Sequence, residues 1–220
     1  MSAFMFPETL NNYRIHMVGI KGTGMAALAE ILVSRGAILT GSDVPEVFYT
    51  DEILKSLGIR PLTSFAPENV GKQVQLVIHS SAYDRGINPD LREAVRRRIP
   101  TVRYTEALGA LSATSRSTGI AGVHGKTTTT ALSGTILDAL ELPCTVLAGS
   151  SLAGFGNRCT LIRGDTYFVA ETCEYQRHFL DFNPVRILLT SVESDHQDCF
   201  PTYENILSAF MQYIDKLPQF

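Results

Sequence analysis

The chain has 220 residues, of which 45% are hydrophobic and 19% charged, and its formal net charge is −3. This length and composition are ordinary for one large or two small globular domains with buried cores. The weak negative charge gives no electrostatic basis for binding nucleic acid or an anionic membrane surface.

Neither the start of the chain nor its apolar segments predict export or membrane insertion. The first residues lack a basic segment followed by a long apolar run, and no apolar stretch is long enough to span a bilayer. The four cysteines are scattered and form no Cys-x-x-Cys pair, which favours free thiols in a reducing compartment. The sequence therefore predicts a soluble cytoplasmic α/β protein, and it leaves the oligomeric state open.

The first predicted strand, residues 14–20, leads directly into a glycine-rich turn and a helix that ends near residue 34. Gly22, Gly24 and Ala27 fit the Gly-x-Gly-x-x-Gly/Ala fingerprint of a doubly wound nucleotide-binding unit. The glycines permit the tight turn and let the backbone approach a diphosphate, while alanine allows close helix–strand packing. A strand-to-helix turn without a ligand remains the alternative.

The second strand, residues 37–40, ends in Gly41-Ser42-Asp43. Asp43 lies about twenty residues beyond the glycines, where the fingerprint expects an acidic residue for a ribose hydroxyl. By itself this spacing suggests NAD, and a turn or helix-cap aspartate is an equally good interpretation.

The strand–helix alternation continues to a predicted domain boundary at residues 112–113. A short helix is expected over 52–57 and a strand over 75–79, and Ser80 and Ser81 follow at the strand end where α/β sheets bind ligands. A helix from residue 88 carries a basic run at 96–98 that we interpret as a solvated face. A strand over 101–104 and a helix from 105 complete this first domain.

The strongest motif is the glycine-rich loop Gly122-Val123-His124-Gly125-Lys126-Thr127, which follows an apolar run. Its backbone N–H groups and the helix N-terminus after it would surround a phosphate. Lys126 would reach the outer phosphates, and Thr127 would place its hydroxyl on Mg²⁺. The spacing is shorter than that of the general P-loop, and an ordinary glycine turn is the weaker alternative.

A helix over 128–140 and a strand over 144–149 are expected after this loop, with the helix core face formed by Leu132, Ile136, Leu137 and Leu140. The strand over 165–171 ends in Glu171, and Glu174 follows three residues later. Carboxylates at a strand end beside a phosphate loop suit magnesium–nucleotide chemistry, because Mg²⁺ prefers oxygen ligands. Two exposed glutamates in a turn are the alternative.

The strand over 186–190 leads into a loop that places His196 among three acidic residues. Beside a nucleotide site this pattern favours a metal or phosphate role over a structural histidine. His196 and Cys199 have zinc-like spacing, but no second pair accompanies them. The last predicted helix begins near residue 201, and its expected core face is Ile206, Leu207, Phe210, Met211 and Ile214.

Taken in order, these motifs resemble the Mur ligases of peptidoglycan synthesis over essentially the whole chain. The resemblance rests on the two glycine-rich loops, on Ser42-Asp43 and Ser80-Ser81, on the Glu171–Leu180 segment and on Asp195-His196. It implies a Rossmann-like UDP-sugar-binding domain over residues 1–112. Residues 113–220 would be the first part of a P-loop-type ATPase domain, the Mur ligase central domain.

The resemblance also implies a reaction and site residues. ATP, with Mg²⁺, would phosphorylate the lactyl carboxylate of UDP-N-acetylmuramate, and the amine of L-alanine would attack the acyl phosphate. The residues that would bind ATP are Gly122, Val123, His124, Gly125, Lys126, Thr127 and Thr128. Lys126, Glu174 and His196 would be catalytic. Thr127 and Glu174 would hold one metal ion, and His196 would hold a second. The UDP-sugar would contact Gly22, Thr23, Gly24, Met25, Ser42, Asp43, Ser80, Ser81 and His124.

Two departures from the family pattern are visible: Val123 stands where threonine is common, and Ser191 where asparagine is common. Because most of the pocket for the amino acid would lie outside this chain, a ligase that adds a recycled murein peptide to the same UDP-sugar remains an alternative. A non-catalytic nucleotide-sugar-binding protein is a second. An NAD-dependent dehydrogenase would leave the loop at 122–130 unexplained.

Overall fold

The computed structural model describes residues 4–218, which form two compact α/β units that divide between Ala107 and Leu108. The α/β class predicted from the sequence is confirmed. Helix α4 (Tyr104–Ser112) runs across the division between the units. The predicted boundary at 112–113 coincides with the end of this helix and stays a prediction.

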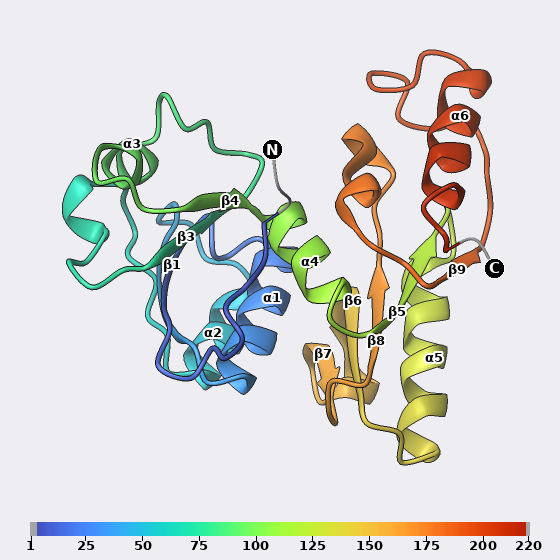
Figure 1. The fold of residues 1–220 in the computed structure, drawn as a ribbon, viewed down its shortest axis with the longest axis horizontal. Coiled ribbons are helices and arrows are strands. Elements are labelled where there is room, and N and C mark those ends of the chain that lie inside the picture. The colour runs from blue at the N-terminus through green and yellow to red at the C-terminus, as the bar shows by residue number, and fades with distance from the viewer. Residues whose placement is uncertain (1–3, 219–220) are drawn as a thin grey trace. The chain divides into compact units, whose positions relative to one another are not determined.

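The first unit is built on a parallel sheet in the order β2-β1-β3-β4 (Figure 1). Its strands and helices are β1 (Arg14–Val18), α1 (Thr23–Ser34), β2 (Ile38–Ser42), α2 (Thr50–Ser56), η1 (Pro67–Asn69), β3 (Leu76–His79), α3 (Pro89–Arg96) and β4 (Thr101–Arg103). Strand β1 is buried from Ile15 onward because it lies between two neighbouring strands. The glycine-rich loop after β1 therefore emerges from the centre of the sheet.

The second unit contains a mixed sheet in the order β7-β6-β8-β5-β9, in which only β7 runs antiparallel to its neighbour. Its elements are β5 (Arg116–Ala121), α5 (Lys126–Ala139), β6 (Cys144–Leu152), η2 (Ala153–Phe155), β7 (Arg158–Ile162), β8 (Tyr167–Glu171), η3 (Tyr175–Asp181), β9 (Arg186–Leu189) and α6 (Tyr203–Ile214). Because β5 pairs in parallel with β8 and with β9, the carboxyl ends of these three strands lie on the same side of the sheet. The predicted phosphate loop, the two glutamates and the Asp195-His196 loop follow these three ends.

The predicted core face of α5 is wrong for three of its four residues. Leu132, Ile136 and Leu140 are about 60% exposed, whereas Thr130 and Gly134 face the sheet. A Cβ added to Gly134 would lie 2.6 Å from the Phe155 ring, so the helix packs too closely for a larger side chain there. Of the four predicted residues, Leu137 is the one that packs against the core cluster, which contains Ile120, Val146 and Phe155.

The predicted core face of α6 is correct for two of its five residues and wrong for two, and the fifth, Ile214, is half-buried. Ile206 and Phe210 are buried, and Ala209 and Tyr213 join them. Leu207 and Met211 are exposed by 37% and 51%, and they lie on the side of the helix away from this core. Phe179 stacks on Tyr213 and meets Phe210 edge to face, which fixes α6 against η3.

Candidate functional site

The loop between β5 and α5 has a backbone that requires glycine at two positions. Gly122 has φ +136° and Gly125 has φ +81°, both in the region that residues with a Cβ disfavour. A Cβ at Gly122 would also collide with the hydroxyl of Thr190. The short Gly-x-x-Gly-Lys-Thr spacing is thus a tight connection that turns the chain from the end of β5 into α5.

The two helices that follow the glycine-rich loops begin without a side-chain cap. Helix α1 has Gly22 and helix α5 has Gly125 at the N-cap, and neither cap forms a side-chain hydrogen bond. By contrast, Asn88 caps α3 and Thr202 caps α6, the latter in a capping box with Asn205. Free N–H groups and the positive end of the helix dipole make an uncapped N-terminus a binding site for a phosphate.

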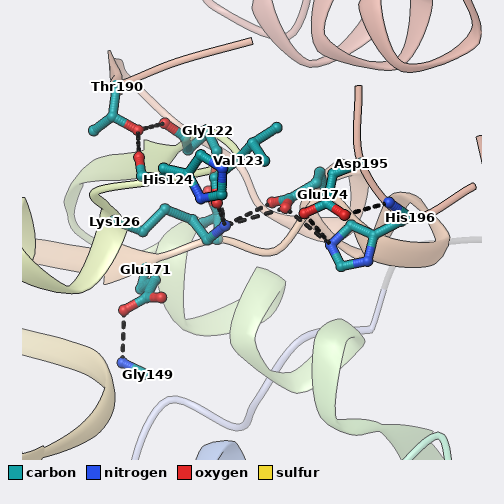
Figure 2. A network of polar contacts seen from close by, with 12 residues as sticks. Gly122, Val123, His124, Lys126, Gly149, Glu171, Glu174, Thr190, Asp195 and His196 are labelled. Atoms are coloured by element: carbon teal, nitrogen blue, oxygen red, sulfur yellow. Dashed lines mark hydrogen bonds and ion pairs between the residues drawn. The ribbon is translucent and has the colours of Figure 1, made fainter. Parts of the chain in front are cut away.

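Lys126, Glu174 and His196 meet beside the first turn of α5 (Figure 2). The Lys126 ammonium lies 3.0 and 3.1 Å from the two carboxylate oxygens of Glu174, and His196 Nε2 lies 3.3 Å from Glu174 Oε1. Glu174 is 1% exposed and Lys126 14% exposed. The nearly buried Glu174 carboxylate therefore lies between the Lys126 ammonium and the His196 ring.

The same ammonium also donates to the phosphate loop itself. Lys126 Nζ lies 2.5 Å from the carbonyl oxygen of Gly122 and 3.3 Å from that of Val123. His196 is positioned by its neighbours, since its ring meets Tyr175 edge to face and its backbone N–H donates to the Asp195 carboxylate at 2.7 Å. The Tyr175 hydroxyl donates in turn to Asp198 at 2.8 Å.

Glu171 takes part in a second set of polar contacts, and it lies below Lys126 in Figure 2. Its carboxylate accepts from the Thr127 hydroxyl at 3.0 and 3.2 Å and from the Gly149 N–H at 2.8 Å. Sequence reasoning expected Thr127 and Glu174 to hold one ion together, but the hydroxyl of Thr127 bonds Glu171. Between residues 4 and 218 no group of three or more His, Cys, Asp or Glu side chains is close enough to hold a metal ion, so the ligand set Thr127, Glu174 and His196 stays a prediction.

The loop after β9 supports the phosphate loop. The Thr190 hydroxyl donates to the carbonyl oxygen of His124 at 2.5 Å, and the His124 N–H donates to the hydroxyl of Ser191 at 3.0 Å. The Val123 N–H donates to the carbonyl oxygen of Ser191. Ser191, which stands where the family pattern commonly has asparagine, therefore shapes the backbone around His124. The side chains of His124 and Thr128 are exposed.

At the glycine-rich loop of the first unit, the two fingerprint glycines have different surroundings. A Cβ at Gly22 would meet the carbonyl oxygen of Gly19 at 3.5 Å and the Met25 side chain at 3.9 Å, both ordinary contacts, so this face of the turn is open. A Cβ at Gly24 would lie 2.8 Å from the Tyr104 ring, so Gly24 is required by packing. Met25 is buried, so its side chain is not offered to a ligand, whereas Thr23 is the first residue of α1.

Ser42 and Asp43 point into the first unit rather than away from it. Ser42 is fully buried and donates to Asp90 at 2.5 Å. The Asp43 carboxylate, 4% exposed, accepts from the N–H groups of Lys21 and Val44 and from the Tyr83 hydroxyl. Burial, and secondarily the Asp43 charge, raises the pKa of Tyr83 to about 12, so the tyrosine stays protonated and donates.

Ser80 and Ser81 lie at the carboxyl end of β3, as the sequence predicts. The Ser80 hydroxyl accepts from the Ala82 N–H at 3.3 Å, and Ser81 is exposed. Of the four predicted UDP-sugar residues outside the glycine-rich loops, only these two have side chains that reach the surface.

Sequence reasoning missed the buried network around Asp90. Its carboxylate lies 3.2 Å from His16 Nε2 and accepts from Ser42 and from the N–H of Ala66, and His16 and Asp90 are both fully buried. Burial raises the pKa of Asp90, but hydrogen bonds from His16, Ser42 and Asn69 outweigh it and hold the pKa below its ordinary value. Sequence separations of 48 and 74 residues give this network no local signal.

The structure thus combines a unit with a parallel sheet and a second unit in which a glycine-rich loop leads into an uncapped helix beside a Lys–Glu–His cluster, an arrangement suited to binding a phosphate. The chain belongs to the Mur ligase family. The model of the Mur ligase family catalytic domain matches residues 14–116, and the model of the Mur ligase middle domain matches residues 120–219.

Individual members of this family are similar to the chain. The UDP-N-acetylmuramate–L-alanine ligase of Treponema pallidum (strain Nichols) is 54% identical over 97% of this chain, which spans 44% of that relative's length. Among solved structures, the UDP-N-acetylmuramate–alanine ligase of Thermotoga maritima matches with a TM-score of 0.79 and 26% identity, over 93% of this chain and 47% of that one.

A second ligase of known structure is equally similar in fold. The UDP-N-acetylmuramate:L-alanyl-γ-D-glutamyl-meso-diaminopimelate ligase of Neisseria meningitidis matches with a TM-score of 0.82 and 25% identity, over 94% of this chain and 69% of that one.

Proposed function

We propose that this chain supplies the UDP-sugar-binding and ATP-binding parts of an ATP-dependent ligase of peptidoglycan precursor synthesis. The ligase joins L-alanine to the lactyl carboxylate of UDP-N-acetylmuramate through an acyl phosphate. The observation that carries the chemistry is the Lys126–Glu174–His196 cluster beside the uncapped end of α5. The choice of L-alanine and UDP-N-acetylmuramate as substrates is supported by the similarity of the chain to a UDP-N-acetylmuramate–L-alanine ligase.

The donors at this site fit a magnesium–nucleotide complex. Thr127, Glu171 and Glu174 present hard oxygen atoms, which Mg²⁺ prefers, within the reach of one phosphate loop. We infer that Thr127 and Glu174 hold one ion and that His196 holds a second, with Glu171 fixing the Thr127 hydroxyl. When bound, Mg²⁺ neutralises charge on the transferred phosphoryl group.

The chain's own residues perform the remaining tasks by position and charge. The N–H groups at the start of α5 bind phosphate oxygens, and the Lys126 ammonium neutralises the outer phosphates. His124, exposed on the same loop, lines the pocket toward the acceptor carboxylate. The N-terminus of α1, at Gly22 and Thr23, binds the diphosphate of the UDP-sugar.

Residues 1–220 alone are expected to bind both nucleotides and to make no amide bond, because the chain spans 44% of the relative's length. Isothermal titration calorimetry with UDP-N-acetylmuramate and with ATP plus Mg²⁺ tests the binding. Tighter binding of NAD than of the UDP-sugar would overturn the assignment. Phosphate release that depends on both the UDP-sugar and L-alanine would show that these residues suffice for catalysis.

The cellular compartment is inferred from the cysteines. None of the four forms a disulfide in the structure, and Cys144 and Cys159 are buried. Buried thiols that form no disulfide are the usual state in a reducing cytoplasm, where we place the protein. Within residues 4–218, no helix combines the length and apolar character that a membrane span needs.

The likeness to the Neisseria meningitidis enzyme favours one alternative function, addition of a preformed peptide to the same UDP-sugar. Sequence identity favours L-alanine, at 54% against 25%. Amide formation by the complete enzyme with L-alanine and with the tripeptide L-alanyl-γ-D-glutamyl-meso-diaminopimelate separates the two. Saturable binding of the UDP-sugar without turnover of either acceptor would instead identify a non-catalytic binding protein.

A further inference from the structure

The end of strand β2 lacks the free carboxylate that the nucleotide-binding fingerprint assigns to a ribose. Asp43 is 4% exposed, and its two oxygens accept from Lys21, Val44 and Tyr83 at 2.7 to 3.0 Å. A nucleoside that extends from the diphosphate at α1 toward β2 therefore needs other contacts.

Lys21, inside the glycine-rich loop, ties residues 44–49 to that loop. Its ammonium donates to the carbonyl oxygens of Val44 at 3.0 Å and Glu46 at 2.8 Å and lies 3.5 Å from the Asp51 carboxylate. Its own carbonyl oxygen accepts from the Thr50 hydroxyl at 2.5 Å. Lys21 is 5% exposed, so its ammonium interacts with groups of the protein and is not accessible to a ligand.

This attachment holds two aromatic side chains beside the start of α1. The Tyr49 hydroxyl lies 2.8 Å from the hydroxyl of Thr23, the first residue of the helix, and the Phe48 ring centre lies 5.9 Å from the Lys21 ammonium. Phe48 is 44% exposed and Tyr49 52% exposed. Tyr49 is thus held at the first residue of the helix whose N–H groups the proposed function assigns to the diphosphate, and Phe48 is held beside Lys21, two residues before that helix.

We propose that Phe48 and Tyr49 form a stacking platform for the pyrimidine base of the bound nucleoside diphosphate, and that Lys21 is the positioning residue for this platform. Flat bases stack favourably on aromatic rings, and a platform fixed in advance loses little conformational entropy on binding. The proposal rests on the proposed function, in which the start of α1 binds the diphosphate of the UDP-sugar.

Calorimetric titration of the 220-residue chain with UDP and, separately, with inorganic pyrophosphate tests the platform. Phe48→Ala is expected to weaken UDP binding about tenfold, a typical effect of removing one stacked ring, and to leave pyrophosphate binding unchanged. Tyr203→Ala, which removes a 43% exposed ring from the second unit, is the matched control and is expected to change neither. Tyr49→Phe keeps the ring and is expected to retain most of the UDP affinity.

The role of Lys21 is tested by Lys21→Met and by the double variant with Phe48→Ala. Lys21→Met is expected to speed amide hydrogen exchange in residues 44–51 and to weaken UDP binding more than pyrophosphate binding. In the double variant, removing Phe48 is expected to have little further effect, because the platform is already displaced. Equal losses for both ligands in Lys21→Met would mean a general structural role and would remove Lys21 from the proposal.

The outcomes separate this proposal from the function on which it rests. UDP binding that is unchanged in Phe48→Ala overturns the platform and leaves the UDP site at α1 intact. A wild-type chain that binds pyrophosphate but gains nothing from the uridine also overturns the platform. A wild-type chain that binds neither UDP nor pyrophosphate overturns the proposed function and the platform together.

Discussion

The ammonium of Lys126 is held by Glu174 and by the carbonyl oxygens of Gly122 and Val123, so its charge lies at the mouth of the phosphate loop. Lys126→Ala in the complete enzyme is expected to abolish turnover while leaving the affinity for UDP-N-acetylmuramate nearly intact. The reason is that phosphoryl transfer depends on positioned positive charge, whereas we propose that the UDP-sugar binds the first unit.

Coupled phosphate release and calorimetry measure these two effects. Lys72→Ala, which removes the charge of an exposed lysine in the first unit, is the control and is expected to keep full turnover. Near-normal turnover in Lys126→Ala would remove Lys126 from the mechanism.

Asp90 is a second residue whose charge matters, here for stability. Asp90→Asn is expected to lower the free energy of unfolding by about 3 kcal/mol at neutral pH, because it breaks a buried charged network with His16 and Ser42. Chemical denaturation followed by circular dichroism measures this change. Glu68→Gln, at an exposed position, is the control and is expected to be neutral.

The pH dependence of this effect follows from the lowered pKa of Asp90. A carboxyl group whose pKa is lower in the folded state stabilises the fold above its unfolded pKa, about 3.9, and loses that contribution as the pH falls through the folded value. The difference between wild type and Asp90→Asn is therefore expected to shrink below about pH 4. A difference that grows on acidification would contradict this role.

At the scale of elements, helix α4 approaches the segment around Asp181 so closely that only glycine fits. A Cβ at Gly109 would overlap the carbonyl oxygen of Asp181, and the Asn183 side chain donates to the carbonyl oxygen of Gly109 at 3.0 Å. Gly109→Ala is expected to destabilise the second unit by about 2 kcal/mol or more, because the backbone must shift to relieve the overlap.

Gly154→Ala provides a matched control within the same unit. A Cβ at Gly154 meets nothing within 4 Å, so its effect on the midpoint of chemical denaturation is expected to be small. Equal midpoints for the two variants would show that α4 can move away from residue 181 without loss.

The elements themselves were largely predictable, because buried parallel strands give short apolar runs between turn residues. Strands β1, β2, β3, β4, β8 and β9 lie where the sequence predicts them, to within a few residues. Strand β7 was missed, since Arg158–Ile162 follows a glycine-rich turn and pairs at the edge of the sheet. Helix faces were less predictable: close packing selected Thr130 and Gly134 for the buried side of α5, against the apolar periodicity.

The candidate site was predictable where residues are close in sequence, and less so where the fold brings them together. The loop from Gly122 to Thr127 is visible from its composition, and so are the acidic residues after β8. The pairing of Thr127 with Glu171 rather than Glu174 depends on which carboxylate faces the helix, and sequence spacing does not determine that. The inward direction of Asp43 likewise depends on Lys21 and Tyr83.

For the whole molecule, two separate cores imply that stability effects are local. Asp90 lies in the first unit and Gly109 in the second, and each interacts with residues of its own unit. The double variant Asp90→Asn/Gly109→Ala is therefore expected to show additive losses, with faster hydrogen exchange from Asp90→Asn confined to residues 14–103. Acceleration of exchange throughout both units by Asp90→Asn alone would contradict two independent cores.

The absence of a side-chain cap at Gly22 has a consequence for protein engineering. Gly22 has φ −57° and open space around its Cβ position, so Gly22→Asp would fit and would cap α1. Such a cap gains about half to one kcal/mol of helix stability. The new carboxylate would then occupy the N–H groups that we assign to a diphosphate and repel it. A selection for thermostability at this position would therefore select against ligand binding, so stability and function compete for the same few N–H groups.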